Sequence, residues 1–238
     1  MGDKRRHRGP HPEDRSDFAE AELSRLRAAT ADLSWLLSRR YAIRSATTLV
    51  GDRYSLTERQ RIAVRRCTCS DKALSDRLAR RIDVAPAPLD LLWIDGFNVI
   101  TTVEAALAGG AILIGRDGCF RDMASMHGSF RAVDETRAAL ELIGETLVAL
   151  HVGNTRWLLD QPVSNSGRLR QMMGILSDER GWNWEVKLVA SPDAMLRQKV
   201  AVASADSGVL DYCGAWLDLA RMVISRHVPD PWIVDLRS

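Results

Sequence analysis

The stretch LLWIDGFNVI, residues 91–100, decides the fold that we expect for this chain. Its first four residues are continuously apolar, which is typical of a parallel strand that is buried on both faces. Asp95 ends this strand, and the spacing of the apolar residues that follow predicts a helix over residues 99–107. A buried strand followed by a helix opens a βαβ unit, so the stretch indicates an α/β fold.

The alternation of strand and helix continues to the C-terminus. Alternating elements of this kind predict a parallel sheet that is flanked by helices on both faces. We expect Ser166 to cap one of the helices and Gly181 to end it, because these residue types suit those positions. Strands are predicted at residues 111–114, 156–159, 184–190, 199–204 and 232–236, and helices at 134–150, 166–180 and 216–224.

The first 85 residues predict a small helical domain with an arginine-rich surface. Thr57 opens the string TERQ, a capping-box pattern that begins a helix. Ser70 is expected to cap the next helix. In that helix the apolar spacing predicts that Leu78 faces inward and that Arg77 faces solvent.

The predicted domain boundary lies in VAPAPL, residues 84–89, which has two prolines and no helical period. It divides a helical domain, residues 1–85, from an α/β domain, residues 86–238. The first domain holds 19 Lys and Arg against 12 Asp and Glu, so it is basic and the second is acidic. A basic half would steer nucleic acid toward a metal site in the acidic half. Charge alone leaves open that the arginines only solvate the helices.

The composition, with 46% hydrophobic and 27% charged residues, is that of an ordinary globular protein. No apolar run approaches the roughly 20 residues that span a bilayer, and no apolar stretch follows the basic N-terminus as in a secretory signal. We therefore expect a cytoplasmic protein without a membrane partner and leave open whether it forms a homodimer. The four cysteines lack zinc-site spacing and are expected to be reduced thiols.

Three predicted strands end in a carboxylate: Asp95, Asp160 and Asp206. Ligands bind at the carboxyl ends of the strands in open parallel sheets, so these three residues would share one edge. Each aspartate on its own is equally explained as a cap for the next helix. Three at one edge favour a shared site, because neighbouring carboxylates repel one another until a cation such as Mg²⁺ or Mn²⁺ binds them. The sequence therefore predicts a divalent-metal site.

The string DGFNVI, which begins at Asp95, resembles the opening strand and turn of PIN-like and NYN nuclease domains. The resemblance implies a PIN-like parallel sheet, with Asp95 as a metal ligand and Asn98 as a supporting residue. The family pattern continues with an acidic residue on a helix, an Asp after a middle strand, and a Thr/Ser-x-Asp strand end. Glu135, Asp160 and Asp206 match these positions. The implied catalytic residues are Asp95, Glu135, Asp160 and Asp206, of which the three aspartates bind metal.

The segment RDGCFRD, residues 116–122, departs from the PIN-like pattern. It is either a surface loop with an Asp-Gly turn or a lid whose arginines reach a phosphate. The string SNSG leaves a similar choice, because Asn165 suits a helix start and a helix N-terminus can bind phosphate. The predicted substrate-binding residues are Asn98, Asn165, Arg116, Arg121 and Arg137.

Nearly the whole chain resembles an uncharacterised prokaryotic family, domain of unknown function 434. The resemblance rests on RGPHPED near the start, LVGDRYSLTERQR at residues 49–61, DGFNVI, RDGCFRD, and LDQPVSNSGRL at residues 158–169. It implies a helical N-terminal part followed by a PIN-like part, and it implies no particular activity.

These observations lead to two main hypotheses. The first is a metal-dependent nuclease, by resemblance an endoribonuclease, in which the basic domain holds RNA and the carboxylates bind Mg²⁺ or Mn²⁺. The second is a nucleic-acid-binding module that kept the fold without catalysis. A phosphohydrolase acting on a small molecule is a third alternative and would need a narrower pocket. Carboxylates converging within about 5–6 Å favour an enzyme, and dispersed or salt-bridged carboxylates favour the binding module.

Overall fold

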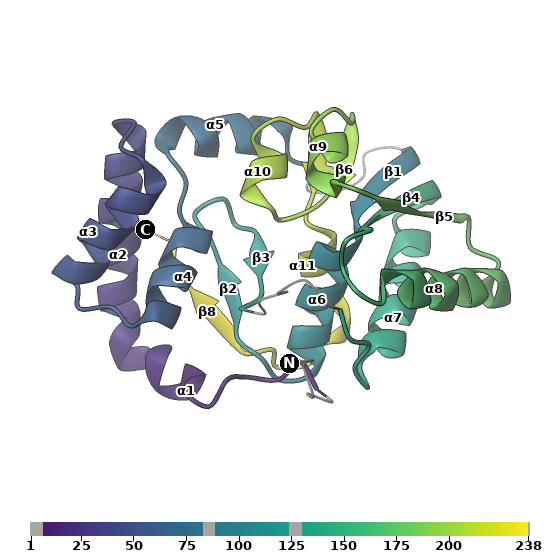
Figure 1. Cartoon of the computed structure of the whole chain (residues 1–238), viewed down its shortest axis with the longest axis horizontal. Helices are drawn as coiled ribbons and strands as arrows, with labels where there is room; N and C mark the ends of the chain where they lie inside the picture. The colour runs from purple at the N-terminus through teal and green to yellow at the C-terminus, as the bar shows by residue number, and fades with distance from the viewer. Residues whose placement is uncertain (1–6, 83–88, 124–129, 238) are drawn as a thin grey trace.

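The N-terminal part of the protein is helical, in a computed structural model that describes residues 7–82, 89–123 and 130–237 (Figure 1). Its helices are α1 (Asp14–Asp17), α2 (Glu20–Ser38), α3 (Ile43–Arg53), α4 (Glu58–Cys67) and α5 (Asp71–Arg80). Thr57 and Gln60 form the predicted capping box at the start of α4, and Ser70 caps α5 as predicted. None of the described helices is long and apolar enough to cross a membrane.

The C-terminal part opens with strand β1 (Leu89–Asp95), which passes directly into helix α6 (Gly96–Leu107). The turn between them requires Gly96, because a Cβ atom there would lie 2.5 Å from a methyl group of Leu159. Apart from Leu89, the predicted linker VAPAPL lies outside the described residues. The elements that follow are β2 (Ile112–Ile114), β3 (Phe120–Arg121), α7 (Thr136–Ala149), β4 (Val152–Asp160), α8 (Ser166–Arg180), β5 (Trp184–Val189), α9 (Pro192–Leu196), β6 (Ala201–Ala203), α10 (Ser207–Leu210), β7 (Ala215–Leu217), α11 (Leu219–His227) and β8 (Ile233–Asp235).

Five parallel strands form the main sheet, in the order β5-β4-β1-β6-β7. Along the chain the sheet grows from β1 through β4 to β5, and it then continues on the other side of β1 with β6 and β7. The order of the strands therefore reverses between β1 and β6. Open α/β sheets bind ligands at such a reversal, outside the carboxyl ends of the strands. This position is where β1 ends in Asp95 and where β6 runs toward Asp206.

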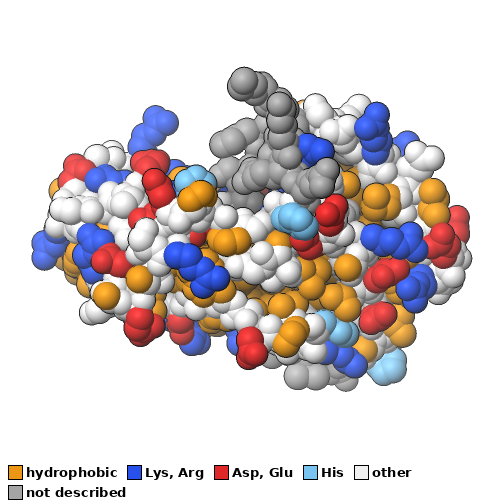
Figure 2. Space-filling view, turned by 90° about the horizontal axis from the view of Figure 1, so that it is seen from below, with side chains coloured by type: hydrophobic (Ala, Val, Ile, Leu, Met, Phe, Trp, Pro, Cys, Tyr) orange, Lys and Arg blue, Asp and Glu red, His pale blue; other side chains and the backbone are white. Residues whose placement is uncertain are grey.

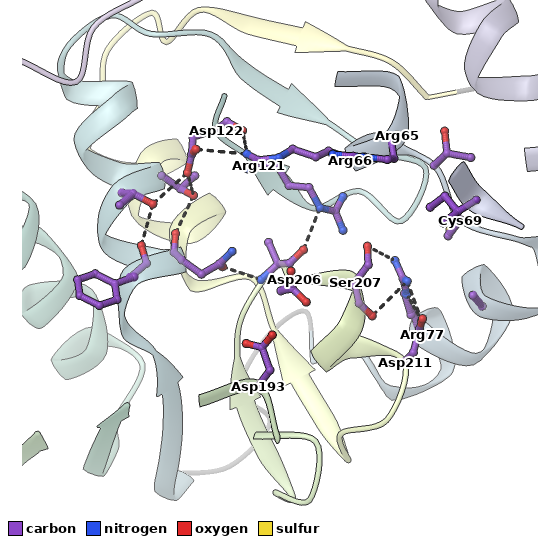
Figure 3. A pocket seen from close by; sticks show the side chains of 18 of the residues that line it. Arg65, Arg66, Cys69, Arg77, Arg121, Asp122, Asp193, Asp206, Ser207 and Asp211 are labelled. Carbon is purple, nitrogen blue, oxygen red and sulfur yellow. Dashed lines mark hydrogen bonds and ion pairs between the residues drawn. The ribbon is translucent and has the colours of Figure 1, made fainter. Parts of the chain in front are cut away.

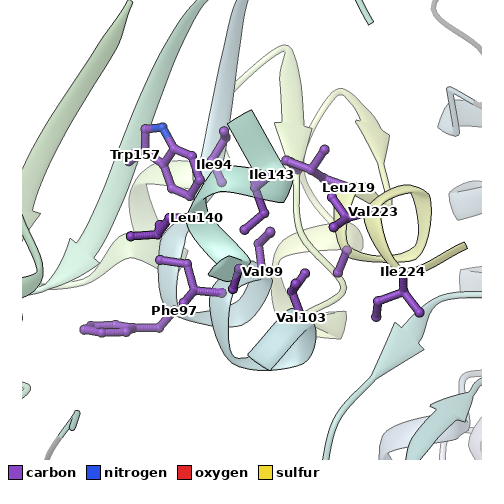
Figure 4. Close-up of a cluster of buried hydrophobic side chains, with 14 of the residues drawn as sticks. Ile94, Phe97, Val99, Val103, Leu140, Ile143, Trp157, Leu219, Val223 and Ile224 are labelled. Carbon is purple, nitrogen blue, oxygen red and sulfur yellow. The ribbon is translucent and has the colours of Figure 1, made fainter. Parts of the chain in front are cut away.

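Side chains on the two faces of the main sheet pack into separate cores, because successive residues of a strand point to opposite faces. On one face, Ile94 and Trp157 pack with residues of α6, α7, α8 and α11 (Figure 4). On the other face, Leu158, Val202 and Trp216 pack with residues of the short helices α9 and α10. The predicted fold class, an α/β domain with a helix-flanked parallel sheet behind a helical N-terminal part, is confirmed.

A second, small sheet has the order β3-β2-β8 and packs against the N-terminal helices. The last predicted strand exists, but it joins this sheet as β8, parallel to β2. Leu113 of β2 and Val234 of β8 share a hydrophobic cluster with Leu26 and Leu33 of α2. The helical part and the α/β part are therefore joined by a common core, while the domain boundary itself stays a prediction.

Three local predictions differ from the structure. Residues 216 and 217, predicted to begin a helix, belong to β7, because they pair with β6 at the edge of the sheet. Asn165 rather than Ser166 is the N-cap residue of α8. In α5, Leu78 is 50% exposed and Arg77 only 2% exposed, which reverses the predicted orientation. The apolar spacing failed there because α5 contacts the α/β domain through ion pairs of Arg77, which hydrophobic periodicity does not register.

Charged side chains are mixed over the face of the molecule shown in Figure 2, where Lys and Arg alternate with Asp and Glu. Ion pairs between neighbouring side chains are common in the described structure, as between Arg156 and Glu185. The basic excess of the first 85 residues therefore does not give that face a surface of a single sign.

Candidate functional site

A cavity of about 810 Å³ lies between the carboxyl ends of the central strands and the helical part (Figure 3). On the helical side its walls come from the end of α4 and from α5, and α6 contributes a further wall. The end of β4 contributes Asp160, and the segments that follow β5 and β6 contribute Asp193 and Asp206. The cavity therefore lies at the reversal of strand order, and both parts of the chain form it.

Four aspartates gather at this edge of the sheet, and we call them the acidic rim: Asp95, Asp160, Asp193 and Asp206. The last three line the cavity, and Asp95 is buried beside them with 6% exposure. Asp95 and Asp160 end β1 and β4, Asp193 lies in α9 after β5, and Asp206 follows β6. The structure thus brings the three aspartates named from the sequence to one edge of the sheet and adds a fourth.

Asp95 is a buried carboxylate whose hydrogen-bond partner is a neutral hydroxyl. Ser204 Oγ donates to Asp95 Oδ2 over 2.8 Å and accepts from the Asp206 amide over 3.0 Å. Asp95 makes no side-chain bond to the start of α6, so it does not act as a helix cap. Burial raises the pKa of Asp95 to about 7, although the Ser204 bond opposes the increase. Repulsion from the rest of the acidic rim adds to the increase.

The other members of the acidic rim also form no ion pair with a basic side chain among the described residues. Burial raises the pKa of Asp160 and of Asp193, and repulsion from Asp206 and Asp160 adds to the increase at Asp193. Asp206 Oδ1 accepts from the amides of Gly208 and Val209, at 2.7 and 3.2 Å, and so caps α10. Within the described residues, no ion pair joins the acidic rim to a Lys or Arg. The nearby charge of Arg197 opposes the increase at Asp193 without forming an ion pair, so the protein offsets the repulsion in this cluster only in part.

The turn between Ser204 and Asp206 is held from both sides. Asn98 Oδ1 accepts from the Ala205 amide over 2.9 Å, and Arg121 Nε donates to the Ala205 carbonyl over 2.8 Å. Both side chains also line the cavity. The two residues, named from the sequence as substrate-binding, thus position the backbone of the acidic rim, and their contact with substrate stays a prediction.

Another wall of the cavity contains a buried charge cluster, which we call the arginine network: Arg77, Asp117 and Arg121. Arg121 donates to both oxygens of Asp117, at 2.8 and 2.7 Å, and Arg77 donates to Oδ2 over 2.6 Å. Burial alone would raise the pKa of Asp117, but the two guanidinium groups outweigh it and hold that pKa below its usual range. Arg77 also forms an ion pair with Asp211 over 2.6 Å. This cluster ties α5 to the α/β part.

The segment RDGCFRD is packed into the protein. Gly118 has a φ of +76°, the left-handed conformation that glycine suits in a tight turn. Arg116 donates to Asp71 of α5 over 2.8 Å, and Asp122 accepts from the hydroxyl of Thr101 in α6 over 3.1 Å. The structure therefore contains the turn, anchored to both parts of the chain, while movement of this segment as a lid stays a prediction.

Besides the buried Asp95, four residues named from the sequence lie outside the cavity walls: Arg116, Glu135, Arg137 and Asn165. Glu135 accepts a short hydrogen bond, 2.6 Å, from His7. Arg137 is exposed and pairs with Glu179 over 2.8 Å, and the side chain of Asn165 donates to a backbone carbonyl. The structure thus does not bring these residues together with the acidic rim.

Sequence reasoning missed Asp193 and did not place the helical part at the ends of the strands. Asp193 follows the end of β5 by four residues, so the rule that carboxyl ends of parallel strands meet at one edge would have found it. Arg65, Arg66 and Arg77 line the cavity, although they belong to α4 and α5. No spacing rule reveals that these helices face the strand ends, because that contact joins distant parts of the chain.

The donor set of the acidic rim suits a hard divalent cation. Carboxylate oxygens favour Mg²⁺ or Mn²⁺, whereas zinc sites usually contain His or Cys. Among the described residues, no group of three or more His, Cys, Asp or Glu is close enough to hold a metal ion. Mg²⁺ commonly needs only one or two carboxylates, because waters and substrate phosphates complete its coordination. The rim therefore fits an ion of this kind better than an ion that needs an all-protein cage.

Fold and cavity together define an α/β protein in which a helical N-terminal part completes an acidic cavity at the sheet edge. The chain belongs to the family described as Domain of unknown function (DUF5616), whose model matches residues 89–222. Residues 25–80 match the family described as Protein of unknown function (DUF434). The resemblance to family 434 is thus confirmed for the helical part, and a different family model covers the α/β part.

A relative with a similar length is Uncharacterized protein MJ0935 from Methanocaldococcus jannaschii. It is 28% identical to this chain over 186 residues, which cover 76% of this chain and 87% of that protein. No solved structure matches the chain. The comparisons therefore establish the family and leave the activity to be argued from the site.

Proposed function

We propose that the protein is a metal-dependent nuclease of the PIN-like type, which cleaves RNA with Mg²⁺ or Mn²⁺ bound at the acidic rim. The proposal is carried by one observation. Four aspartates gather at the reversal of strand order and have no ion pair with a described Lys or Arg. Buried charges that serve only the framework are normally paired, as Asp117 is. An acidic cluster without ion pairs beside a cavity is more typical of a cation site.

In this proposal the two walls of the cavity have different tasks. The acidic rim holds the cation, and Ser204 orients Asp95 through its hydrogen bond to Oδ2. Arg65 lines the cavity, is exposed, and has no ion pair with the described residues, so its guanidinium is available for a phosphate. A bound metal would polarise a phosphate oxygen and lower the pKa of a water. One cavity would thus combine anion binding with cation-assisted hydrolysis.

The variant Asp95→Asn tests the proposal because it keeps the shape of the side chain and removes its charge. We expect Mn²⁺-dependent cleavage of end-labelled single-stranded and hairpin RNA to fall by at least about 100-fold. The matched control is Asp218→Asn. Asp218 is 5% exposed and its pKa is raised by burial to about 6, but its partners are the amides of Phe120 and Arg221.

Equal cleavage by wild type and Asp95→Asn would remove Asp95 from the mechanism. Wild-type protein that cuts neither RNA nor DNA with either metal would reject the proposal. In that case a non-catalytic binding module becomes the better reading. One observation favours that alternative: Asp206 already serves as the cap of α10. It would be supported by salt-dependent binding of nucleic acid without cleavage.

The size of the cavity keeps a small phosphoester as a second candidate substrate. A volume of about 810 Å³ lies within the range of roughly 300–1,000 Å³ that is usual for small-ligand pockets. The same assays should therefore include nucleoside monophosphates and p-nitrophenyl phosphate. Turnover of these compounds without cleavage of any polymer would assign the acidic rim to a phosphohydrolase.

A further inference from the structure

The corner between α2 and α3 carries an unusual surface, which we call the aromatic corner: residues 35–49. Trp35, Tyr41, Ile43 and Leu49 are between 46% and 58% exposed. These four are nearly half of the nine large hydrophobic side chains that are exposed in the described structure. Soluble surfaces rarely concentrate such residues without a binding partner. The aromatic corner is therefore a candidate contact surface.

Its charge indicates what kind of partner it suits. Residues 33–51 contain Arg39, Arg40 and Arg44 and no acidic residue. Arg40 and Arg44 are exposed and form no ion pair with the described residues. This differs from the face in Figure 2, where acidic and basic side chains are mixed. A surface with positive charge and exposed aromatic rings matches a partner with negative charge and flat apolar groups.

The geometry of Trp35 supports the same conclusion. The Arg39 guanidinium lies 3.6 Å from the centre of the Trp35 ring, in a stacked cation–π contact. The ring remains 54% exposed despite this contact, while its neighbours Leu33 and Leu36 are buried in the helical core. Trp35 thus points away from the core, with a guanidinium beside it that limits its movement. A fixed, exposed ring of this kind is suited to stacking on a nucleic-acid base.

The aromatic corner is continuous with the cavity. Leu37 of α2 and Ile43 of α3 line the cavity, and Ile43 belongs to the corner itself. Ser38 Oγ accepts from the amide of Asp71 over 2.9 Å, which fixes the corner next to the start of α5. A strand with one phosphate beside Arg65 would therefore leave the cavity over this corner.

We propose that the aromatic corner is a stacking platform for unpaired bases of a single-stranded nucleic acid, with Trp35 and Tyr41 contacting bases and Arg40 and Arg44 contacting phosphates. The inference rests on the proposed function, because it takes the strand to be the one that enters the cavity. It adds a second contact region outside the site of hydrolysis. A second copy of the chain or a protein partner at this surface is an outcome that the test separates.

Binding is measured by fluorescence anisotropy with end-labelled 12-nucleotide oligouridylate and oligothymidylate, in EDTA so that no cleavage occurs. We expect Trp35→Ala together with Tyr41→Ala to weaken binding of the preferred oligonucleotide at least about fivefold, since one base stack is worth roughly 1–3 kcal/mol. The control is Val148→Ala together with Ile175→Ala, which removes side chains that are 57% and 51% exposed. Comparing the two oligonucleotides distinguishes RNA from DNA.

The arginines are tested through the salt dependence of binding. Replacing Arg40 and Arg44 by Ala should reduce the slope of log affinity against log salt by about 1.4, because two phosphate contacts are lost from a single strand. Arg170→Ala together with Arg226→Ala is the charge-matched control, since both arginines are exposed and unpaired among the described residues. An equal change in both double variants would mean that only net charge matters, and the platform would be rejected.

Three results would overturn the inference. One is unchanged oligonucleotide binding by the Trp35 and Tyr41 double variant. Another is an equal loss of affinity for a duplex of the same sequence, because paired bases cannot stack on the platform. The last is that the Trp35 and Tyr41 double variant loses self-association, measured by light scattering, without a change in its binding of nucleic acid. If the Trp35 and Tyr41 double variant binds more weakly but the wild type cleaves no nucleic acid, the stacking platform is supported and the nuclease proposal is rejected. The failure of one proposal can therefore be distinguished from the failure of the other.

Discussion

The acidic rim and the arginine network border the same cavity, but the buried aspartate is paired with arginines only in the arginine network. In the arginine network, Asp117 is bonded to both Arg77 and Arg121, which hold its pKa below the usual range. In the acidic rim, Asp95 is bonded to a serine hydroxyl, and its pKa is raised to about 7. Their exposures, 2% and 6%, are nearly the same. The two aspartates differ in their partners and hardly in their burial.

This difference separates a structural charge from one that is open to a ligand. A carboxylate that is paired inside the protein has little remaining capacity for a cation, and removing it leaves its basic partner as an unpaired buried charge. A buried carboxylate without a counter-charge lowers stability, and such groups cluster at functional sites. Replacing an aspartate should therefore have opposite effects on stability in the two clusters. The first two predictions below use that contrast, and the predictions run from the largest expected effect to the smallest.

The largest effect is expected for Asp117→Asn. This change leaves the buried Arg121 guanidinium without a counter-charge and Arg77 with only its outer partner Asp211, so it should lower the free energy of unfolding by about 3–5 kcal/mol. Urea denaturation measures the difference. The control is Asp211→Asn, which removes the outer partner of Arg77. The side chain of Asp211 is 36% exposed, so this change should lower the free energy of unfolding by less than about 1 kcal/mol. Similar losses in the two variants would mean that the arginine network contributes no more than a surface pair.

The next prediction concerns Asp95→Asn and the pH dependence of stability. The pKa of Asp95 rises from a usual 3.8 to about 7 on folding, so the folded state binds more protons between these values. The contribution of this proton binding to the stability of the folded state is complete below pH 4 and is lost as the pH rises through 7. The free energy of unfolding of Asp95→Asn should equal that of the wild type near pH 4. Above pH 7 it should be higher than that of the wild type, by roughly 4 kcal/mol at most.

Unfolding midpoints in urea from pH 4 to pH 8 measure this difference. Asp218→Asn provides the comparison, because burial raises the pKa of Asp218 to only about 6. The gain in the free energy of unfolding above pH 7 should therefore be smaller for Asp218→Asn than for Asp95→Asn. An Asp95→Asn variant that is less stable than the wild type at pH 8 would contradict the description of Asp95 as a buried carboxylate without a counter-charge.

A smaller effect is expected for Asn98→Ala, which removes the acceptor for the Ala205 amide next to the acidic rim. The loss of one hydrogen bond from a partly buried site should lower the free energy of unfolding by about 1 kcal/mol. Asn154→Ala removes an exposed side-chain bond to the backbone and should change it by less than about 0.5 kcal/mol. If the two variants are equivalent, the turn that carries Asp206 does not depend on Asn98.

Local patterns predicted the α/β part well because they depend on neighbouring residues. The apolar run before Asp95 forms β1, and the alternation of strands and helices gives the parallel sheet. The rule that strand ends share an edge places Asp95, Asp160 and Asp206 together from the sequence alone. The same rule would have supplied Asp193 had the segment after β5 been included.

Contacts between distant segments were beyond such patterns. Arg77 was predicted to face solvent, because helical periodicity treats a charged residue as exposed, and its partners Asp117 and Asp211 lie far away in the sequence. Glu135 was chosen by a family pattern, and in the structure it contacts His7 away from the cavity. Arg121 and Asn98 were predicted at the site, but their hydrogen bonds to the Ala205 backbone required the packed fold.

The most direct test is a titration with Mn²⁺, followed by the electron paramagnetic resonance signal of the free ion. Wild-type protein should remove Mn²⁺ from solution in a saturable manner, Asp95→Asn should bind at least about tenfold more weakly, and Asp211→Asn should bind like the wild type. Mg²⁺ should compete for the same ion site. Absence of saturable binding at millimolar Mn²⁺, or equal affinity in Asp95→Asn, would contradict the assignment of the acidic rim as a cation site.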